Sequence, residues 1–162
     1  MLKKIKEKLP TYLIAIAIPL VVGVVAALLT RGNMDIYEEI VKPPLAPPGI
    51  LFPIVWTILY VLMGISSALI VINKENSIDA ATRGLTNYGM SLLFNFFWPI
   101  FFFNLESYLI SFIWLVVLFY LILRTVLEYR HVSRLAALLQ IPYLVWVAFA
   151  GYLNCAIWLL NP

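Results

Sequence analysis

Residues 43–73 read PPLAPPGILFPIVWTILYVLMGISSALIVIN and contain no charged side chain. A helix that crosses a hydrocarbon core of roughly 30 Å needs about 20 apolar residues. The part from residue 50 to residue 73 meets that length. The proline-rich part before it cannot be helical throughout, because proline has no amide donor and restrains the residue that precedes it. This stretch therefore predicts a stiff loop followed by a transmembrane helix.

The rest of the chain repeats this pattern. Four other charge-free runs occupy residues 10–30, 84–105, 107–123 and 135–159. The chain is 64% hydrophobic and 12% charged, whereas soluble domains are about 45–50% apolar and about 25% charged. We predict an all-α integral membrane protein, a bundle of five transmembrane helices in a single domain over residues 1–162. Residues 124–134 are expected to form a loop, and residues 105–107 a tight turn.

The distribution of basic residues predicts an orientation. The N-terminal tail and the segments 74–83 and 124–134 hold nine of the eleven Lys and Arg residues, and the segment 31–42 holds the other two. Positively charged loops stay on the cytoplasmic side. The N-terminus is therefore expected inside and the C-terminus outside, in the cytoplasmic membrane if the source is a bacterium. Because the basic residues do not form one face, we expect no nucleic-acid partner.

Polar residues inside the apolar runs recur on single helical faces. Asn87, Ser91 and Asn95 are spaced four apart, and Gln140 and Asn154 lie close to four turns apart. Two interpretations remain open. These groups either form interhelical hydrogen bonds worth about 0.6 kcal/mol each, or converge on an internal pocket of the aromatic-lined kind that ligands occupy. Five Trp and nine Tyr residues in the chain favour the pocket.

Two small-residue pairs, Gly23 with Ala27 and Gly64 with Ala68, fit the pattern that lets membrane helices approach closely. The pattern serves either packing within the chain or dimerisation. Tyr129 is expected in the aromatic belt at a membrane interface.

Conventional catalytic and metal-binding patterns are missing from the sequence. His131 lies beside two arginines and Cys155 is the single cysteine, so we expect no metal site and no cofactor. There is no nucleophile elbow, phosphate-binding loop or dinucleotide fingerprint, and no pair of carboxylates within a span. Hydrolytic and phosphoryl-transfer chemistry are therefore not expected.

Several separate motifs follow one another along nearly the whole chain. They are Lys42-Pro43, Pro47-Pro48, the run from Phe52 to Tyr60, Met63-Gly64, Asn95, Trp98-Pro99, Phe101-Phe102, the run from Pro142 to Trp146, Phe149-Ala150 and Leu153-Asn154. In this combination and order the chain resembles the TspO/MBR family, which comprises tryptophan-rich sensory proteins and the mitochondrial translocator protein, formerly the peripheral benzodiazepine receptor.

The resemblance implies five helices around a pocket open toward the first loop, a homodimer in membrane lipid, and binding of porphyrins such as protoporphyrin IX and haem, or of another planar hydrophobic molecule. It also implies binding of isoquinoline carboxamide and benzodiazepine ligands. The ligand-binding candidates carried over by motif are Trp56, Tyr60, Asn95, Trp98, Trp146, Phe149, Ala150 and Asn154. Asn87 and Ser91 join them from the helical-face pattern, and Lys42, Pro43, Pro47 and Pro48 are the candidate lid.

Three functions remain open at this stage. The first is a membrane receptor or carrier that binds tetrapyrroles in its bundle. The second is an enzyme that breaks down protoporphyrin IX with light and oxygen, in which the resemblance implies a photochemical role for Trp56 and Trp146. The third is a stress-linked scaffold protein. The cholesterol motif of animal members is incomplete, because no basic residue follows Leu153.

Overall fold

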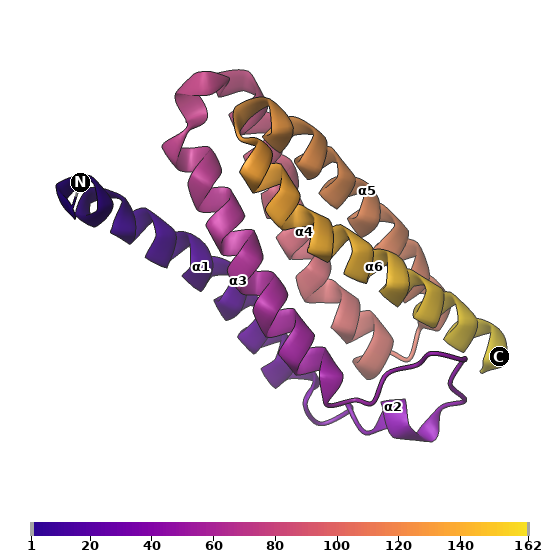
Figure 1. Ribbon diagram of the computed structural model, residues 1–162. Coiled ribbons are helices and arrows are strands. Elements are labelled where there is room, and N and C mark those ends of the chain that lie inside the picture. The colour runs from indigo at the N-terminus through magenta and orange to yellow at the C-terminus, as the bar shows by residue number, and fades with distance from the viewer. Residues whose placement is uncertain (1, 162) are drawn as a thin grey trace.

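The computed structural model describes residues 2–161, and the side chains of residues 8–161. Five long helices and three short helical segments follow one another, with no strand in the described part (Figure 1). They are α1 (Leu2–Thr30), α2 (Ile36–Glu39), α3 (Leu51–Ile72), the 3-10 turn η1 (Lys74–Asn76), α4 (Ile78–Pro99), the π-helical turn η2 (Ile100–Asn104), α5 (Tyr108–Val132) and α6 (Arg134–Leu160). The all-α prediction is confirmed. The side chains of Lys3, Lys4 and Lys6, which contribute to the predicted orientation, lie outside the described residues.

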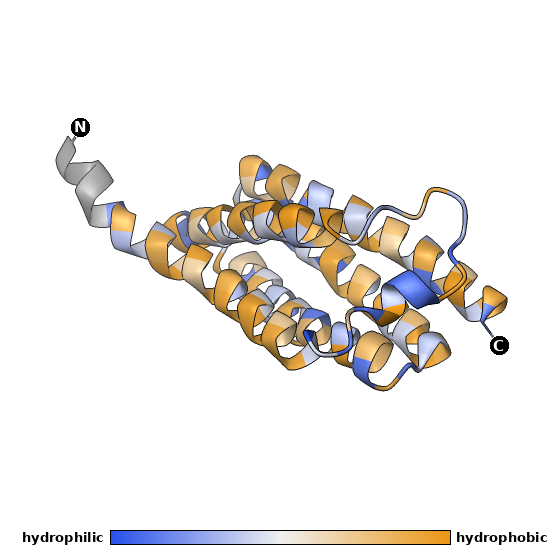
Figure 2. Ribbon diagram, turned by 90° about the horizontal axis from the view of Figure 1, so that it is seen from below, coloured by the Kyte–Doolittle hydropathy of each residue, from blue (hydrophilic) through white to orange (hydrophobic). Residues whose placement is uncertain are grey.

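Four of the helices are long and apolar enough to cross a membrane. They are residues Lys8–Thr30, Leu51–Ile72, Tyr108–Val132 and Arg134–Leu160. The fifth long helix, α4, is less apolar because its first half carries Asp79, Arg83 and two threonines. Apolar residues dominate the outer faces of the bundle, whereas the short helix α2 is hydrophilic (Figure 2). These four to five long helices form a bundle of the kind that spans a membrane.

The long helices pack as a ring. Around it run α1, α3, α6, α5 and α4, and α4 closes the ring against α1. The contacts of α4 with α1 and α3 are sparse, whereas α5 packs extensively against both α4 and α6. The first loop and the end of α6 lie together at one end of the bundle (Figure 1). The sparse side of the ring is where room for a cavity remains.

The contact between α1 and α3 depends on two glycines. A Cβ on Gly64 would lie 2.8 Å from the Ala15 carbonyl oxygen and would overlap the Ile16 backbone. Pro19 has no amide to donate to that carbonyl within α1, so the Gly64 side of α3 approaches a carbonyl left free by proline. A Cβ on Gly23 would overlap the Tyr60 ring. The small residues at these two positions therefore serve packing within the chain.

The contact between α4 and α5 corrects one expectation. Tyr129 is fully buried instead of lying at a membrane interface. A Cβ on Gly84 would lie 2.6 Å from the Tyr129 ring, so the missing side chain of this glycine makes the space that the ring occupies. The aromatic-belt interpretation of Tyr129 was therefore wrong.

The loop expected at residues 124–134 is also wrong. Helix α5 continues to Val132, and the connector to α6 is reduced to Ser133, whose hydroxyl accepts a hydrogen bond from the Ala136 amide. The charged residues stay helical because Glu128 pairs with Arg83 of α4 at 3.0 Å and with Arg124 at 3.3 Å. Their charges compensate one another on the faces of α4 and α5, so they do not end the helix.

The other boundaries match more closely. The turn at residues 105–107 is confirmed, and its central residue Glu106 adopts a left-handed φ of 49°, which reverses the chain within three residues. Helix α4 begins at Ile78, before the predicted start at residue 84, and its regular part ends at Pro99, after which the π-helical turn η2 continues to Asn104.

We expect Gly64→Ala to destabilise the protein by roughly 1–3 kcal/mol, since overpacking forces the α1 and α3 backbones apart. Thermal unfolding of the detergent-solubilised protein measures the effect. Gly151→Ala is the matched control, because a Cβ there meets nothing within 4 Å and alanine is the better helix former. An unfolding temperature for Gly64→Ala at or above that of the parent protein would contradict the backbone contact.

Candidate functional site

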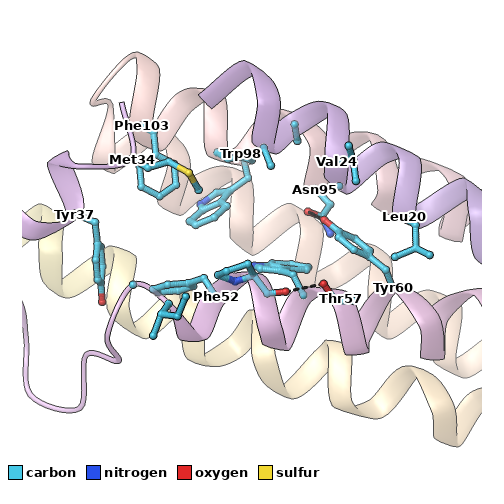
Figure 3. A pocket seen from close by; sticks show the side chains of 18 of the residues that line it. Leu20, Val24, Met34, Tyr37, Phe52, Thr57, Tyr60, Asn95, Trp98 and Phe103 are labelled. Carbon is cyan, nitrogen blue, oxygen red and sulfur yellow. Dashed lines mark hydrogen bonds between the residues drawn. The ribbon is translucent and has the colours of Figure 1, made fainter. Parts of the chain in front are cut away.

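A cavity of about 580 Å³ lies between α1, α3 and α4 beneath the first loop (Figure 3). Its volume falls within the range of roughly 300–1,000 Å³ that small-molecule sites occupy. It is lined by Leu20, Gly23, Val24, Ala26 and Ala27 of α1; Met34, Asp35, Tyr37, Glu38, Gly49 and Ile50 of the first loop; Phe52, Pro53, Trp56, Thr57 and Tyr60 of α3; and Asn95, Trp98, Pro99 and Phe103. The charged lining residues, Asp35 and Glu38, belong to the loop, so the walls formed by the long helices are neutral.

Helix α3 supplies the aromatic wall. Trp56 and Tyr60 are one turn apart, and their rings stack with centroids 5.4 Å apart and an interplanar angle of 28°. Trp56 also packs against Tyr143 of α6 in an edge-to-face arrangement, with ring centroids 6.1 Å apart. This packing holds the Trp56 indole in one orientation, with part of it left as cavity wall.

Asn95 of α4 links the aromatic wall to α6. The Tyr60 hydroxyl donates to Asn95 Oδ1 at 3.5 Å, and Asn95 Nδ2 donates to the Tyr143 hydroxyl at 3.2 Å. Asn95 is only 4% exposed. A buried amide that lost these partners would cost about 1–3 kcal/mol, so the network fixes the amide at the inner end of the cavity.

Trp98 forms the wall opposite α3, and Asn154 of α6 positions it. The Trp98 indole N–H donates to Asn154 Oδ1 at 3.0 Å. Asn154 Nδ2 in turn donates to the Tyr108 carbonyl oxygen at 2.7 Å. Asn154 and Ala150 line a second, smaller cavity that shares Tyr37, Phe52, Trp98 and Phe103 with the first. These two predicted residues therefore support the cavity wall from behind.

Trp146 and Phe149 lie farther back. The Trp146 ring meets the edge of Phe52 at 6.0 Å and packs on Phe149 at 5.6 Å. Phe52 lines both cavities and Trp146 lines neither. The indole N–H of Trp146 is buried and has no hydrogen-bond partner among the described residues.

The stripe on α4 reaches the cavity only at Asn95. Ser91 is buried and donates to the Tyr88 carbonyl oxygen of its own helix at 2.7 Å. Asn87 is half-buried, one turn farther from the cavity. Of the predicted ligand-binding residues, the structure brings together Trp56, Tyr60, Asn95 and Trp98 as wall residues.

The predicted lid residues belong to the first loop but lie away from the cavity. Residues 40–50 are not helical, as predicted. Pro43 and Pro47 are buried and Pro48 is exposed, but none of them lines the cavity. Lys42 donates to Glu38 at 2.6 Å and lies over the Tyr37 ring at 4.7 Å from its centroid.

Three hydrogen-bonded anchors fasten this loop. The Tyr37 hydroxyl donates to the Pro47 carbonyl oxygen at 2.9 Å, and the Tyr152 hydroxyl of α6 donates to the Pro44 carbonyl oxygen at 2.9 Å. Asn161 both accepts from the Val41 amide at 2.9 Å and donates to the Val41 carbonyl oxygen at 3.0 Å. Burial, and then the Glu38 carboxylate, raise the pKa of Tyr37 above the ordinary value, at which the hydroxyl is already a donor at neutral pH.

Sequence reasoning missed the contribution of α1 and the inner layer of the loop. Leu20, Gly23 and Val24 line the cavity, as do Tyr37 and Phe52. The signal for Phe52 was available, since it begins the motif that also contains Trp56. The α1 residues carry no chemical signal beyond a small-residue pair, because their role is to leave space.

Residues 15–159 match the TspO/MBR family. The chain belongs to the TspO/MBR family. The resemblance predicted from its motifs is therefore confirmed, and the TspO/MBR protein described above is a multi-pass membrane protein.

Relatives within the TspO/MBR family come from bacteria, archaea and animals. The chain is 36% identical over 159 residues to the tryptophan-rich protein TspO of Chlorobaculum tepidum, which covers 96% of this chain and 99% of that protein. It is 35% identical to the tryptophan-rich protein TspO of Archaeoglobus fulgidus, over 88% of this chain and 91% of that protein. It is 32% identical to the translocator protein of Bos taurus, over 87% of this chain and 84% of that protein.

We expect Asn154→Leu to lower stability by about 1–3 kcal/mol, because it leaves the Trp98 indole N–H and the Tyr108 carbonyl oxygen without partners. Thermal unfolding and near-ultraviolet circular dichroism of the Trp98 environment measure the change. Asn87→Leu makes the same replacement at a half-buried position of α4 for which no hydrogen bond is described, and should leave both signals near those of the parent. Equal losses in the two variants would contradict the positioning role of Asn154.

Proposed function

We propose that this protein is a membrane receptor or carrier that holds a planar apolar ligand, a tetrapyrrole such as protoporphyrin IX or haem, in the cavity between α1, α3 and α4. The observation that carries the proposal is the cavity itself, with Trp98 of α4 facing Phe52 and Tyr60 of α3 across it (Figure 3). Flat aromatic rings pack well between such walls. Planar isoquinoline carboxamide and benzodiazepine-type ligands fit the same description.

The polar groups of the cavity support this class of ligand. The inner end offers the Asn95 amide and the Tyr60 hydroxyl, and the charged side chains Asp35 and Glu38 lie in the loop at the outer end. Ligand sites usually combine apolar walls with a few polar groups that set orientation. A planar molecule with one polar edge satisfies both ends of this cavity.

The finer membrane arrangement is part of the proposal. α4 lies between α1 and α5 in the ring, which favours five spans. The arginines near the start of α4 and the end of α5 lie at the end of the bundle opposite to the first loop. Because basic residues stay on the cytoplasmic side, this end, which also holds the N-terminus, is inside. We also propose a homodimer, as the family resemblance implies. Gly23 and Gly64 are occupied by packing within the chain, so the dimer contact uses a different surface.

A second candidate function is light- and oxygen-dependent breakdown of bound protoporphyrin IX. The observation that favours it is the position of the Trp56 indole in the cavity wall, in reach of any ligand there. Phe52 lies between Trp146 and the cavity, so Trp146 would not contact the ligand directly. A stress-linked scaffold is the remaining alternative, and it predicts that cavity substitutions have no effect.

In the dark, the purified protein should bind protoporphyrin IX saturably, as measured by the absorbance and fluorescence of the ligand. Trp98→Ala should weaken binding roughly tenfold, or about 1.4 kcal/mol, because it removes one of the two facing walls. Trp158→Ala is the matched control, since Trp158 is partly exposed and does not line the cavity. Equal affinities for the two variants would exclude this cavity as the binding site.

Trp56→Phe separates binding from breakdown. Phenylalanine keeps an aromatic wall, so binding in the dark should change less than about threefold, or roughly 0.7 kcal/mol. Loss of protoporphyrin absorbance under light in air should slow markedly if the indole takes part in the reaction, and Trp146→Phe should slow it less. Unchanged photobleaching in the Trp56→Phe variant would contradict a photochemical role for Trp56.

A further inference from the structure

The cavity is open on its side. Several residues that line it are also exposed on the outer surface of the bundle. They are Val24 and Ala27 of α1, and Pro53 and Thr57 of α3. Val24 is 58% exposed. The lining residues of α4 are buried or half-buried instead. The side opening therefore lies between α1 and α3.

The opening follows from the way α1 and α3 meet. Gly64 lies against the α1 backbone, and the contact of Gly23 with Tyr60 closes the gap between the two helices at the inner end of the cavity, which both residues line. Beyond it, toward the loop end, the facing residues include the small side chains of Ala27 and Thr57. The Thr57 hydroxyl donates to the Pro53 carbonyl oxygen of its own helix at 2.8 Å, so it forms no bridge to α1. These small side chains leave the gap between α1 and α3 unfilled.

The surface around the opening is apolar. Val21 and Leu28 of α1 and Ile54 and Ile58 of α3 are each more than half exposed. All four belong to helices that are long and apolar enough to span a membrane. In a bilayer such side chains face lipid, so the opening leads into the hydrocarbon and not into water.

The loop end of the cavity is closed by hydrogen bonds and carries charged side chains. The anchors at Tyr37, Tyr152 and Asn161 hold the loop in place. A further hydrogen bond joins Asn33 to Asn104 at 2.9 Å, and Asn104 also donates to the Leu29 carbonyl oxygen at 3.1 Å. Access from this end requires several hydrogen bonds to break, and an apolar ligand would pass the carboxylates of the loop.

We propose that the opening between α1 and α3, flanked by Val24, Ala27, Pro53 and Thr57, is a lateral portal through which a planar apolar ligand dissolved in the bilayer enters and leaves the cavity. This inference rests on the proposed function, since it concerns the route of the same ligand. Pro19 removes a helix hydrogen bond one turn before Gly23, and proline is a common cause of helix bending. α1 can therefore bend there to widen the portal for a ring system.

The test measures the rates of association and dissociation of protoporphyrin IX in the dark, with the protein in lipid nanodiscs. Ala27→Trp and the milder Thr57→Phe add bulk at the portal. For a portal, both rate constants should fall by a similar factor, roughly tenfold for Ala27→Trp, because a barrier on the route slows passage in both directions. Ile113→Trp places the same bulk on an exposed position of α5 and should leave both rates unchanged.

Two further variants test the competing route. Tyr152→Phe and Asn161→Ala each remove a loop anchor without touching the cavity wall. Unchanged association rates in both support the portal, whereas faster association would show that the ligand passes the loop and would overturn it. Parent-like association rates in folded Ala27→Trp and Thr57→Phe proteins would also overturn the portal. In that case, saturable binding by the parent protein would still support the proposed function. Absence of saturable binding by the parent protein would overturn both the portal and the proposed function.

Discussion

The close approach of α1 to α3 is the constraint on which the rest of the structure depends. Gly64 lets the two backbones touch, and Gly23 lets the Tyr60 ring pack against α1. With its ring fixed there, the Tyr60 hydroxyl reaches Asn95 of α4 and its face stacks on Trp56. One backbone contact thus sets the positions of two cavity walls and of the amide between them. It also sets where the helices begin to separate, which is where the cavity opens.

Much of the fold was accessible from the sequence because the bilayer imposes a simple rule on chain length and charge. The five apolar runs correspond to the five long helices, and the turn at Glu106 was evident from a single charged residue between two runs. The rule failed where charges compensate one another. Arg124 and Glu128 follow the apolar run of α5, but as a hydrogen-bonded group with Arg83 of α4 they allow α5 to continue. Pairing between distant segments is not visible in a count of charges.

The candidate site was only partly accessible for a related reason. Helical spacing fixes which residues of one helix share a face, but it does not fix which neighbour that face meets or where along it a cavity lies. Asn87, Ser91 and Asn95 share a face, and only Asn95 reaches the cavity. Trp146 was singled out by its motif, whereas the ring between it and the cavity belongs to Phe52 on another helix. The space contributed by α1 has no chemical signature at all.

The anchors of the first loop bear on the order in which the protein is made. Asn161 is 120 residues beyond Val41, and Tyr152 is 108 residues beyond Pro44. A membrane protein is synthesised and inserted from its N-terminus, so the loop between α1 and α3 is made long before its partners in α6 exist. During biogenesis the cavity walls from α1, α3 and α4 can assemble while their cover is still unfastened. Insertion of the last helix is thus the event that closes the loop end of the bundle.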